Sequence, residues 1–235
     1  MNTPENSPEW TPPLANDDPN PDRQALAKTG RQVLDRLRSD PWAERIPTDR
    51  ADLYAFHGFV TPDECEHLVR LIDRVAKPSA MHDHGYGKDY RTSFSGDVDT
   101  RDPVVRAVER RLDDCLGLDP SWGETVQGQR YAVSQEFREH YDWFWTRGDY
   151  WPEESRRGGQ RSWTTMVYLN DVEEGGETDF TRLGLAIPPQ RGFMLAWNNA
   201  LADGSLNYDT LHAGKPVLRG TKYIVTKWYR TRKWG

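Results

Sequence analysis

The sequence predicts a mainly β domain with flanking helices, built as a two-sheet jelly roll. From Thr125 onward it consists of short β-rich runs separated by Gly, Pro and Asn, whereas the part before Thr125 carries helical apolar patterns. At 235 residues the chain is long enough to bury the core of one large domain, and no internal repeat is visible. A two-sheet jelly roll of short strands binds a small ligand at its mouth.

The first residues divide into two segments. Residues 1–22 are rich in Pro, Asn and Asp and almost free of apolar side chains, so we expect them to be disordered or extended. Residues 23–51 are expected to form an N-terminal helix and a linker, and we assign this helix no chemistry. The apolar residues that recur at helical spacing are Leu26, Val33, Leu34 and Leu37.

Two further helices are expected beside the sheets. Residues 52–60 are typical of a strand, and a helix then begins at Thr61 with Pro at its first position and Glu three residues after the cap. The next helix begins at Asp102 and ends at Gly117. Each has a buried apolar stripe, so both are expected to support one sheet. The main strands predicted after Thr125 cover residues 163–169, 178–181, 193–197 and 221–230.

Composition disfavours several classes of partner. A formal net charge of −6 repels phosphate backbones, so nucleic acid is not expected to bind. No run approaches the roughly 20 apolar residues that span a bilayer, and residues 1–8 lack a basic leader and an apolar region. We therefore expect no membrane partner and a cytoplasmic location. Cys65 and Cys115 are isolated, which is typical of thiols that fill a core.

The pattern that constrains function most is formed by His140, Asp142 and His212. Residues i and i+2 of a strand point to the same side, so His140 and Asp142 can converge on one ion while Tyr141 faces away. His212 would arrive from another strand. Two imidazoles and one carboxylate hold a ferrous ion and leave positions free for a co-substrate and dioxygen. The pattern therefore predicts iron-dependent oxidation.

Lys222 lies ten residues after His212, beyond a turn rich in Gly and Pro. A cation at this distance from a metal-binding histidine suits the distal carboxylate of a dicarboxylate chelated at the metal. Alternate residues of a strand share one face, so the strand over residues 221–230 is expected to line a cavity. The residues on that face are Lys222, Ile224, Thr226, Trp228 and Arg230.

Six segments of the sequence carry a family pattern together. They are Arg91-Thr92-Ser93, Glu124 to Tyr131, Phe137 to Asp142, Gly158 to Arg161, Tyr168 to Thr178, and His212 to Trp228. With them, the chain resembles the prolyl 4-hydroxylase branch of the 2-oxoglutarate and Fe(II) dependent dioxygenases. The likeness covers roughly residues 52–235 and implies a double-stranded β-helix with a jelly-roll core at about residues 125–235.

The resemblance implies a hydroxylase of unactivated C–H bonds that uses Fe(II), 2-oxoglutarate and O2, with ascorbate as a reductant. A proline in a peptide or protein is the first expectation for its substrate. The metal ligands would be His140, Asp142 and His212, and the residues that bind the co-substrate would be Lys222, Tyr131 and Thr178. The residues implied to contact the substrate are Arg91, Ser93, Glu124, Arg161, Trp228 and Arg230.

Two positions depart from the family pattern. Phe137 stands where the family has a tyrosine, and Arg230 where it has a histidine. These changes weaken the case for a polyproline-like peptide, so a free amino acid or another small metabolite remains an alternative substrate. The alternative from a different class is a jelly-roll module that binds metal without oxidative activity.

Two other groups of residues could bind a metal or a substrate. His82 and His84 offer a second pair of metal-binding side chains, but they lie in a Gly-containing stretch without a nearby third ligand, so an exposed loop is expected. An aromatic insert could form a wall for the substrate, although ordinary packing explains it equally well. Its members are Trp143, Phe144, Trp145, Tyr150 and Trp151.

Overall fold

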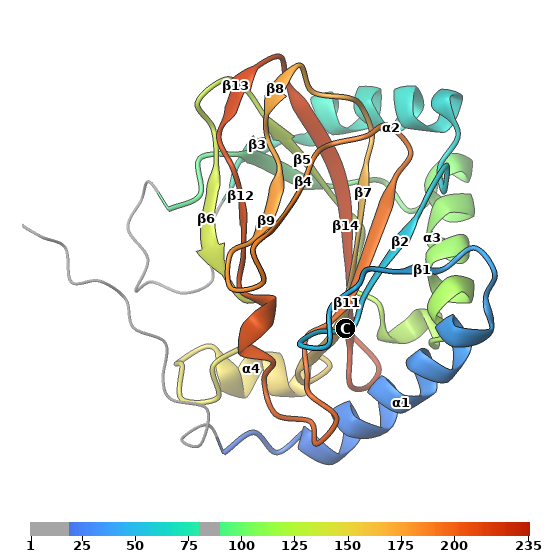
Figure 1. Cartoon of the computed structure of the whole chain (residues 1–235), viewed down its shortest axis with the longest axis vertical. Coiled ribbons are helices and arrows are strands. Elements are labelled where there is room, and N and C mark those ends of the chain that lie inside the picture. Colours follow the sequence, from blue (N-terminus) through green and yellow to red (C-terminus); the bar gives the residue numbers. More distant parts are fainter. Residues whose placement is uncertain (1–18, 80–89) are drawn as a thin grey trace, which may run out of the picture.

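Two antiparallel sheets face each other in the computed structural model, which describes residues 19–79 and 90–235 (Figure 1). The larger sheet contains, in spatial order, β1 (Glu44–Arg45), β2 (Leu53–Phe56), β11 (Met194–Asn198), β7 (Arg161–Tyr168), β14 (Lys222–Arg230), β5 (Gln127–Tyr131), β4 (Phe94–Asp97) and β3 (Lys77–Pro78). The smaller sheet contains β10 (Leu185–Ile187), β9 (Thr178–Phe180), β12 (His212–Gly214) and β6 (Phe137–His140). A separate two-stranded ladder joins β8 (Glu174–Gly175) and β13 (Val217–Arg219). The predicted jelly roll is confirmed.

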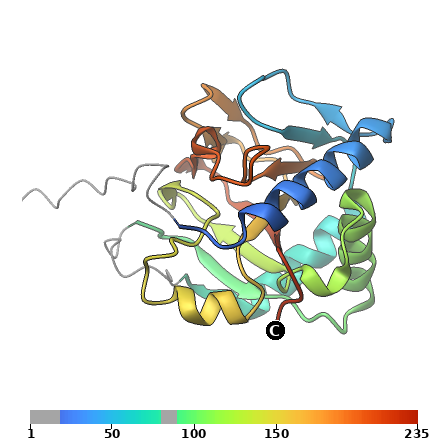
Figure 2. The same cartoon turned by 90° about the horizontal axis from the view of Figure 1, so that it is seen from below.

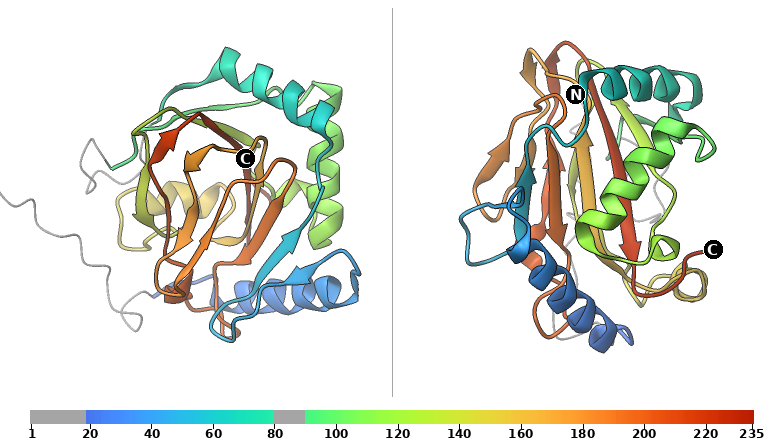
Figure 3. Two further views of the ribbon diagram at one scale, coloured as in Figure 1. Left: turned by 45° about the horizontal axis from the view of Figure 1, so that its top comes forward. Right: turned by 90° about the vertical axis from the view of Figure 1, so that its right-hand side faces the viewer.

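Helices cover the outer face of the larger sheet, while the smaller sheet faces its inner side (Figure 3). These helices are α1 (Arg23–Ser39), α2 (Pro62–Val75) and α3 (Pro103–Leu116), whereas the short α4 (Trp151–Arg156) contributes no residue to their core. Helix α1 packs beside α3 (Figure 2). Because α1, α2 and α3 each bury an apolar stripe, they form one core with the outward-facing residues of the sheet.

The predicted helix ends are confirmed in detail. Thr61 Oγ1 accepts a hydrogen bond from the backbone N–H of Glu64, whose carboxylate accepts one from the backbone N–H of Thr61, so α2 begins with a capping box. The Asp102 carboxylate caps α3 by accepting hydrogen bonds from the backbone N–H groups of Val104 and Val105, and Gly117 ends the helix with a φ of 63°. These local signals fix where the two supporting helices lie in the chain.

Alternation along β7 and β14 divides their side chains between two environments. Trp163 and Val167 of β7 pack toward the helices, whereas Met166 and Tyr168 pack toward the smaller sheet. Along β14, Val225 and Tyr229 belong to the helical side and Ile224 to the inner side. The inner side of these two central strands therefore lines the space between the sheets.

Of the N-terminal segment, residues 1–22, the structure describes only residues 19–22. Residues 1–18 lie outside the described residues. Within the remainder, Asn20 and Asp22 are buried, and the Asp22 carboxylate accepts hydrogen bonds from the Gln160 N–H and the Thr231 hydroxyl. Residues 19–22 are therefore fixed to the domain.

Cys65 and Cys115 are free and buried, as expected for core thiols. Burial raises the pKa of Cys65 to about 11 and that of Cys115 to about 12, so both stay neutral and unreactive. Of the helices that the structure describes, none has the length and apolar character needed to cross a bilayer.

Candidate active site

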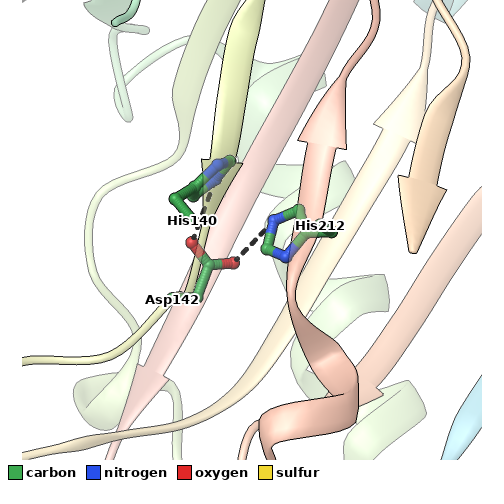
Figure 4. A group of neighbouring side chains, drawn as sticks. All are labelled: His140, Asp142 and His212. Atoms are coloured by element: carbon green, nitrogen blue, oxygen red, sulfur yellow. Dashed lines mark ion pairs between the residues drawn. The ribbon is translucent and has the colours of Figure 1, made fainter. Parts of the chain in front are cut away.

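His140, Asp142 and His212 converge at one end of the smaller sheet (Figure 4). His140 ends β6 and His212 begins β12, and the two residues are direct partners across the antiparallel pair. Asp142 lies two residues beyond His140, past the end of β6, so the strand expected to carry both residues is shorter than predicted. One ligand atom from each side chain lies within 4.8 Å of the other two.

Hydrogen bonds select the tautomer of both imidazoles. His140 Nδ1 lies 2.8 Å from the Arg138 carbonyl oxygen, and His212 Nδ1 lies 2.9 Å from that of Thr210. A carbonyl only accepts, so each Nδ1 carries the proton and each Nε2 keeps its lone pair. The two Nε2 atoms lie 3.9 Å and 3.8 Å from the Asp142 carboxylate oxygens. Burial also lowers the pKa of His140 well below its ordinary value, which favours the neutral ligand form.

The donor set fits a ferrous ion. Three buried side chains offer two neutral imidazole nitrogens and one carboxylate, the combination that non-haem Fe(II) oxygenases use. Within the described ranges, no other group of three His, Cys, Asp or Glu side chains lies close enough to share an ion. His82 and His84 lie outside the described residues.

A cavity of about 40 Å³ runs from this triad to Lys222. Lys222 is 1% exposed, and no carboxylate of the described chain forms an ion pair with it. Its Nζ instead lies 5.3 Å and 5.4 Å from the ring centres of Tyr131 and Tyr168. Burial lowers the pKa of Lys222 to about 7, opposed in part by the charge of Glu177, which forms no ion pair with it, so the protonated side chain has no counter-charge in direct contact. An anionic ligand would supply that counter-charge.

Tyr131 and Thr178 line the same cavity, as expected for residues beside the co-substrate. Tyr131 lies opposite Lys222 in the β5–β14 pair and donates a hydrogen bond to Gln129 Oε1 at 2.7 Å. The Thr178 hydroxyl accepts one from Tyr168 at 2.7 Å. Both residues thus face the cavity that contains Lys222, and each is held in place by a hydrogen bond to a neighbouring side chain.

A larger cavity of about 330 Å³ opens beside the triad. His140, Asp142, Phe137 and Trp228 line both cavities, so the two meet at the metal-binding side chains. The predicted substrate residues that line the larger cavity are Arg91, Glu124, Arg161, Trp228 and Arg230. Ser93 does not line it; its hydroxyl instead accepts a hydrogen bond from Arg91 Nε at 3.1 Å. Ser93 is thus placed to orient Arg91.

Ion pairs fix one wall of the larger cavity. Arg161 donates two hydrogen bonds to the Glu124 carboxylate at 2.7 Å and 2.8 Å, and Arg230 pairs with the same carboxylate at 2.7 Å. Arg230 also pairs with Glu154 of α4. Although burial opposes ionisation, Arg161 and Arg230 hold the pKa of Glu124 below its ordinary value. The charge of Arg230 is therefore already compensated within the protein.

The two departures from the family pattern both have defined partners. Phe137 stacks on the imidazole of His140, with ring centres 3.5 Å apart and an interplanar angle of 12°. Arg91 lies over the same phenyl ring at 4.8 Å. At the other departure, the guanidinium carbon of Arg230 lies 4.4 Å from the centre of the Phe144 ring. Phe144 belongs to the aromatic insert and lines the larger cavity together with Trp143, Trp145 and Tyr150.

Sequence reasoning missed several residues that support the site. Thr164 donates a hydrogen bond to Asp142, Gln129 accepts one from Tyr131, and the indole of Trp197 contacts the His212 ring edge-on at 5.1 Å. Their inward positions follow from strand alternation. Their contacts depend on how the two sheets face each other, which no local motif encodes.

Comparison with known proteins adds to this geometry. Residues 126–230 match the family model described as the 2OG-Fe(II) oxygenase superfamily. A probable prolyl 4-hydroxylase 10 of Arabidopsis thaliana is 31% identical, over 90% of this chain and 78% of its own length. Prolyl 4-hydroxylase 5 of the same plant is 33% identical, over 82% of this chain and 72% of its own length.

The chain belongs to the 2OG-Fe(II) oxygenase superfamily. Within it, the chain is prolyl 4-hydroxylase-like. The viral collagen prolyl hydroxylase of Paramecium bursaria Chlorella virus-1, solved with 2-oxoglutarate, has 29% sequence identity and a TM-score of 0.59, over 75% of this chain and 94% of that one. This 2OG oxygenase is thus an Fe(II) and 2-oxoglutarate dependent dioxygenase, and an inactive metal-binding module is not supported.

Proposed function

We propose that this 2OG oxygenase hydroxylates a proline in a peptide or protein. The observation that carries the proposal is the meeting of two cavities at one triad: the small one leads to Lys222, and the large one is open to a substrate. This division separates a site for a dicarboxylate from a site for the C–H bond to be oxidised. The prolyl hydroxylases to which the chain is similar support the choice of proline.

The proposed roles follow from the position of each side chain. His140, Asp142 and His212 would bind Fe(II), and Lys222 would pair with the distal carboxylate of 2-oxoglutarate. Tyr131 and Thr178 would donate or accept hydrogen bonds at the same co-substrate. Iron bound there would activate O2, with one oxygen atom entering the succinate formed as 2-oxoglutarate loses CO2 and the other entering the hydroxyl group of the substrate.

The protein contributes binding, orientation and exclusion of water. Lys222 is 1% exposed and Tyr131 is 2% exposed, so a carboxylate beside them would be desolvated and strongly held. In the larger cavity, the indole of Trp228 lies against Arg161, whose guanidinium carbon is 4.1 Å from the ring centre. Trp228 thus offers a rigid apolar surface close to the metal-binding side chains, suited to the ring of a prolyl residue.

The wall around Arg230 bears on the substrate class. A free amino acid carries a carboxylate that needs a cation, but Arg230 and Arg161 already pair with Glu124 and Glu154. A prolyl residue within a chain is uncharged, which agrees better with a wall whose charges are balanced. The wall around Arg230 therefore favours a peptide over the free amino acid, whereas Arg91, which lines the same cavity, donates hydrogen bonds to the neutral side chains of Ser93 and Gln127.

The test is a hydroxylation assay with proline-containing peptides and free L-proline as competing substrates. We expect succinate formation coupled to a gain of one oxygen in the peptide, seen by mass spectrometry, and no product with Asp142→Ala. Conversion of the free amino acid with no peptide product would establish the small-metabolite alternative instead. Incubation of a cell lysate with the enzyme, iron and 2-oxoglutarate would then identify the natural target.

Two finer expectations belong to the proposal. We place the enzyme in the cytoplasm, where a reducing environment keeps iron ferrous and suits its two free thiols. Ascorbate would act as the reductant that restores Fe(II) after unproductive turnover. Omission of ascorbate from the assay, with turnovers counted over time, tests the second expectation.

A further inference from the structure

A chain of hydrogen bonds reaches the triad from the neighbouring sheet. Thr164 of β7 donates from its hydroxyl to Asp142 Oδ2 at 2.9 Å. Asn199, just after β11, donates from its side-chain amide to the Thr164 hydroxyl oxygen at 3.0 Å. Thr164 is 0% exposed and Asn199 is 1% exposed, so the chain is shielded from water along its length.

The direction of this chain follows from the number of protons available. The Thr164 hydroxyl has one hydrogen, and two groups lie within hydrogen-bond distance of its oxygen. When Asn199 presents its amide nitrogen, the hydroxyl hydrogen is left for the carboxylate of Asp142. The reversed amide would place two acceptors around one hydrogen. Asn199 therefore fixes Thr164 as a donor to Asp142.

Asn199 is itself held rigidly. Its backbone N–H donates to the Ser162 carbonyl at 2.8 Å, and its carbonyl accepts from the Asn207 N–H at 3.0 Å. Its side-chain oxygen has no hydrogen-bond partner among the described residues although it is buried. A buried amide with half of its capacity unused is costly, which fits a residue retained for the bond that it does make.

The two oxygens of Asp142 consequently differ. Oδ2 accepts the bond from Thr164, whereas Oδ1 has no hydrogen bond from the part of the chain that the structure describes. A carboxylate held in this way presents one oxygen to an ion and is prevented from turning to present both. Carboxylates that bind through one oxygen leave more coordination positions for other ligands.

We propose that Asn199 and Thr164 are positioning residues that hold Asp142 by Oδ2 and leave Oδ1 for the metal. The proposal rests on the metal-binding role assigned to Asp142 above. It predicts that metal affinity depends on two residues that have no ligand atom in the triad. Neighbours of this kind typically change metal affinity by about 10- to 100-fold when they are removed.

The experiment is a titration of the metal-free protein with Co(II), followed by calorimetry and by the visible absorption of the bound ion. Thr164→Val removes the hydroxyl and keeps the shape of the side chain. We expect the affinity for Co(II) to fall about 10- to 100-fold, and Thr164→Ser to restore most of it. Asn199→Leu should weaken binding in the same direction without altering β7.

A matched control is available on the same strand. Thr165 is also buried, and its side chain points to the face of the sheet opposite to that of Thr164. There its hydroxyl donates a hydrogen bond to the Lys227 carbonyl. Thr165→Val should therefore lower the unfolding midpoint about as much as Thr164→Val and leave Co(II) affinity unchanged. Equal Co(II) affinities for these two variants would overturn the proposal.

The double variant tests whether the two residues act in series. If Asn199 acts only through Thr164, then Thr164→Val combined with Asn199→Leu binds Co(II) no more weakly than Thr164→Val alone. Additive losses would contradict the series and overturn the proposal. Asp142→Ala distinguishes the metal site from the positioning role. Normal Co(II) binding in Asp142→Ala would refute the metal site itself. Loss of Co(II) binding in Asp142→Ala together with normal binding in Thr164→Val would refute only the positioning role.

Discussion

Lys222 lies directly opposite Tyr131 in the antiparallel pair of β14 and β5, with its ammonium nitrogen 5.3 Å from the centre of the phenol ring. The ring faces the cation but cannot neutralise it. A second ring, that of Tyr168, lies 5.4 Å away. The protein thus keeps one buried positive charge between two aromatic rings at the end of a cavity that begins at His140 and His212.

Removal of that charge should weaken binding of 2-oxoglutarate. Loss of one member of a desolvated charge pair costs about 2 to 5 kcal/mol, so Lys222→Met is expected to reduce affinity roughly thirtyfold or more. Anaerobic titration of the Fe(II) protein with 2-oxoglutarate measures this change. Affinity for Co(II) in the absence of 2-oxoglutarate should be unaltered in the same variant. An unchanged affinity for 2-oxoglutarate would show that Lys222 is not its partner.

Binding of 2-oxoglutarate should also depend on pH. Burial lowers the pKa of Lys222 from 10.5 to about 7, so the free protein holds this proton below pH 7 and loses it above. Because the dicarboxylate binds the charged form, its dissociation constant should rise roughly tenfold between pH 7 and 8.5, with a proton taken up on binding. Calorimetry in buffers of different ionisation enthalpy detects that proton.

The matched variant for this test is Lys222→Arg. A guanidinium stays charged over the whole range, whereas the triad and all other groups that titrate are retained. The pH dependence assigned to Lys222 should therefore disappear in this variant. The same slope in both proteins would place the titrating group elsewhere.

The pair of Arg230 and Glu154 should contribute to stability more than any surface pair. Both side chains are buried, so Glu154→Gln leaves Arg230 with only Glu124 as a counter-charge. Breaking a buried pair by removing one partner typically costs about 3 to 5 kcal/mol. Glu124 remains as a partner for Arg230, so the lower end of that range is expected, measured by denaturant unfolding.

A surface pair provides the comparison. Arg101 and Asp99 form an ion pair in which both side chains are exposed. Arg101→Ala should therefore leave the unfolding midpoint nearly unchanged. If Glu154→Gln behaves like Arg101→Ala, the ion-pair wall of the larger cavity does not stabilise the fold.

The sequence was sufficient to predict the parts of this protein that local rules determine. The capping box at Thr61 and the left-handed Gly117 mark helix ends, and both were found where their residue types place them. The inward face of β14 followed from alternation, and Lys222, Ile224, Thr226 and Trp228 indeed line the small cavity. The convergence of His140, Asp142 and His212 was expected from their spacing together with the family pattern.

Other features depend on how distant segments pack. The role of Thr164 could not be predicted, because several residues of β7 face inward and only the approach of Asp142 selects one of them. The partner of Arg230 could not be predicted either, because Glu154 reaches it from the short helix α4 after an irregular aromatic segment. Asp142 was expected within a strand but lies beyond the end of β6, where it still turns toward both histidines.

Anaerobic addition of 2-oxoglutarate to the Fe(II)-loaded protein is the most direct test of the central claim that the triad and Lys222 form one site. Chelation of iron by the keto acid should produce a weak visible absorption band in the native protein. This band should be lost in Asp142→Ala, and Lys222→Met should need a much higher concentration of 2-oxoglutarate to develop it. Absence of the band in the native protein at saturating 2-oxoglutarate would contradict the account.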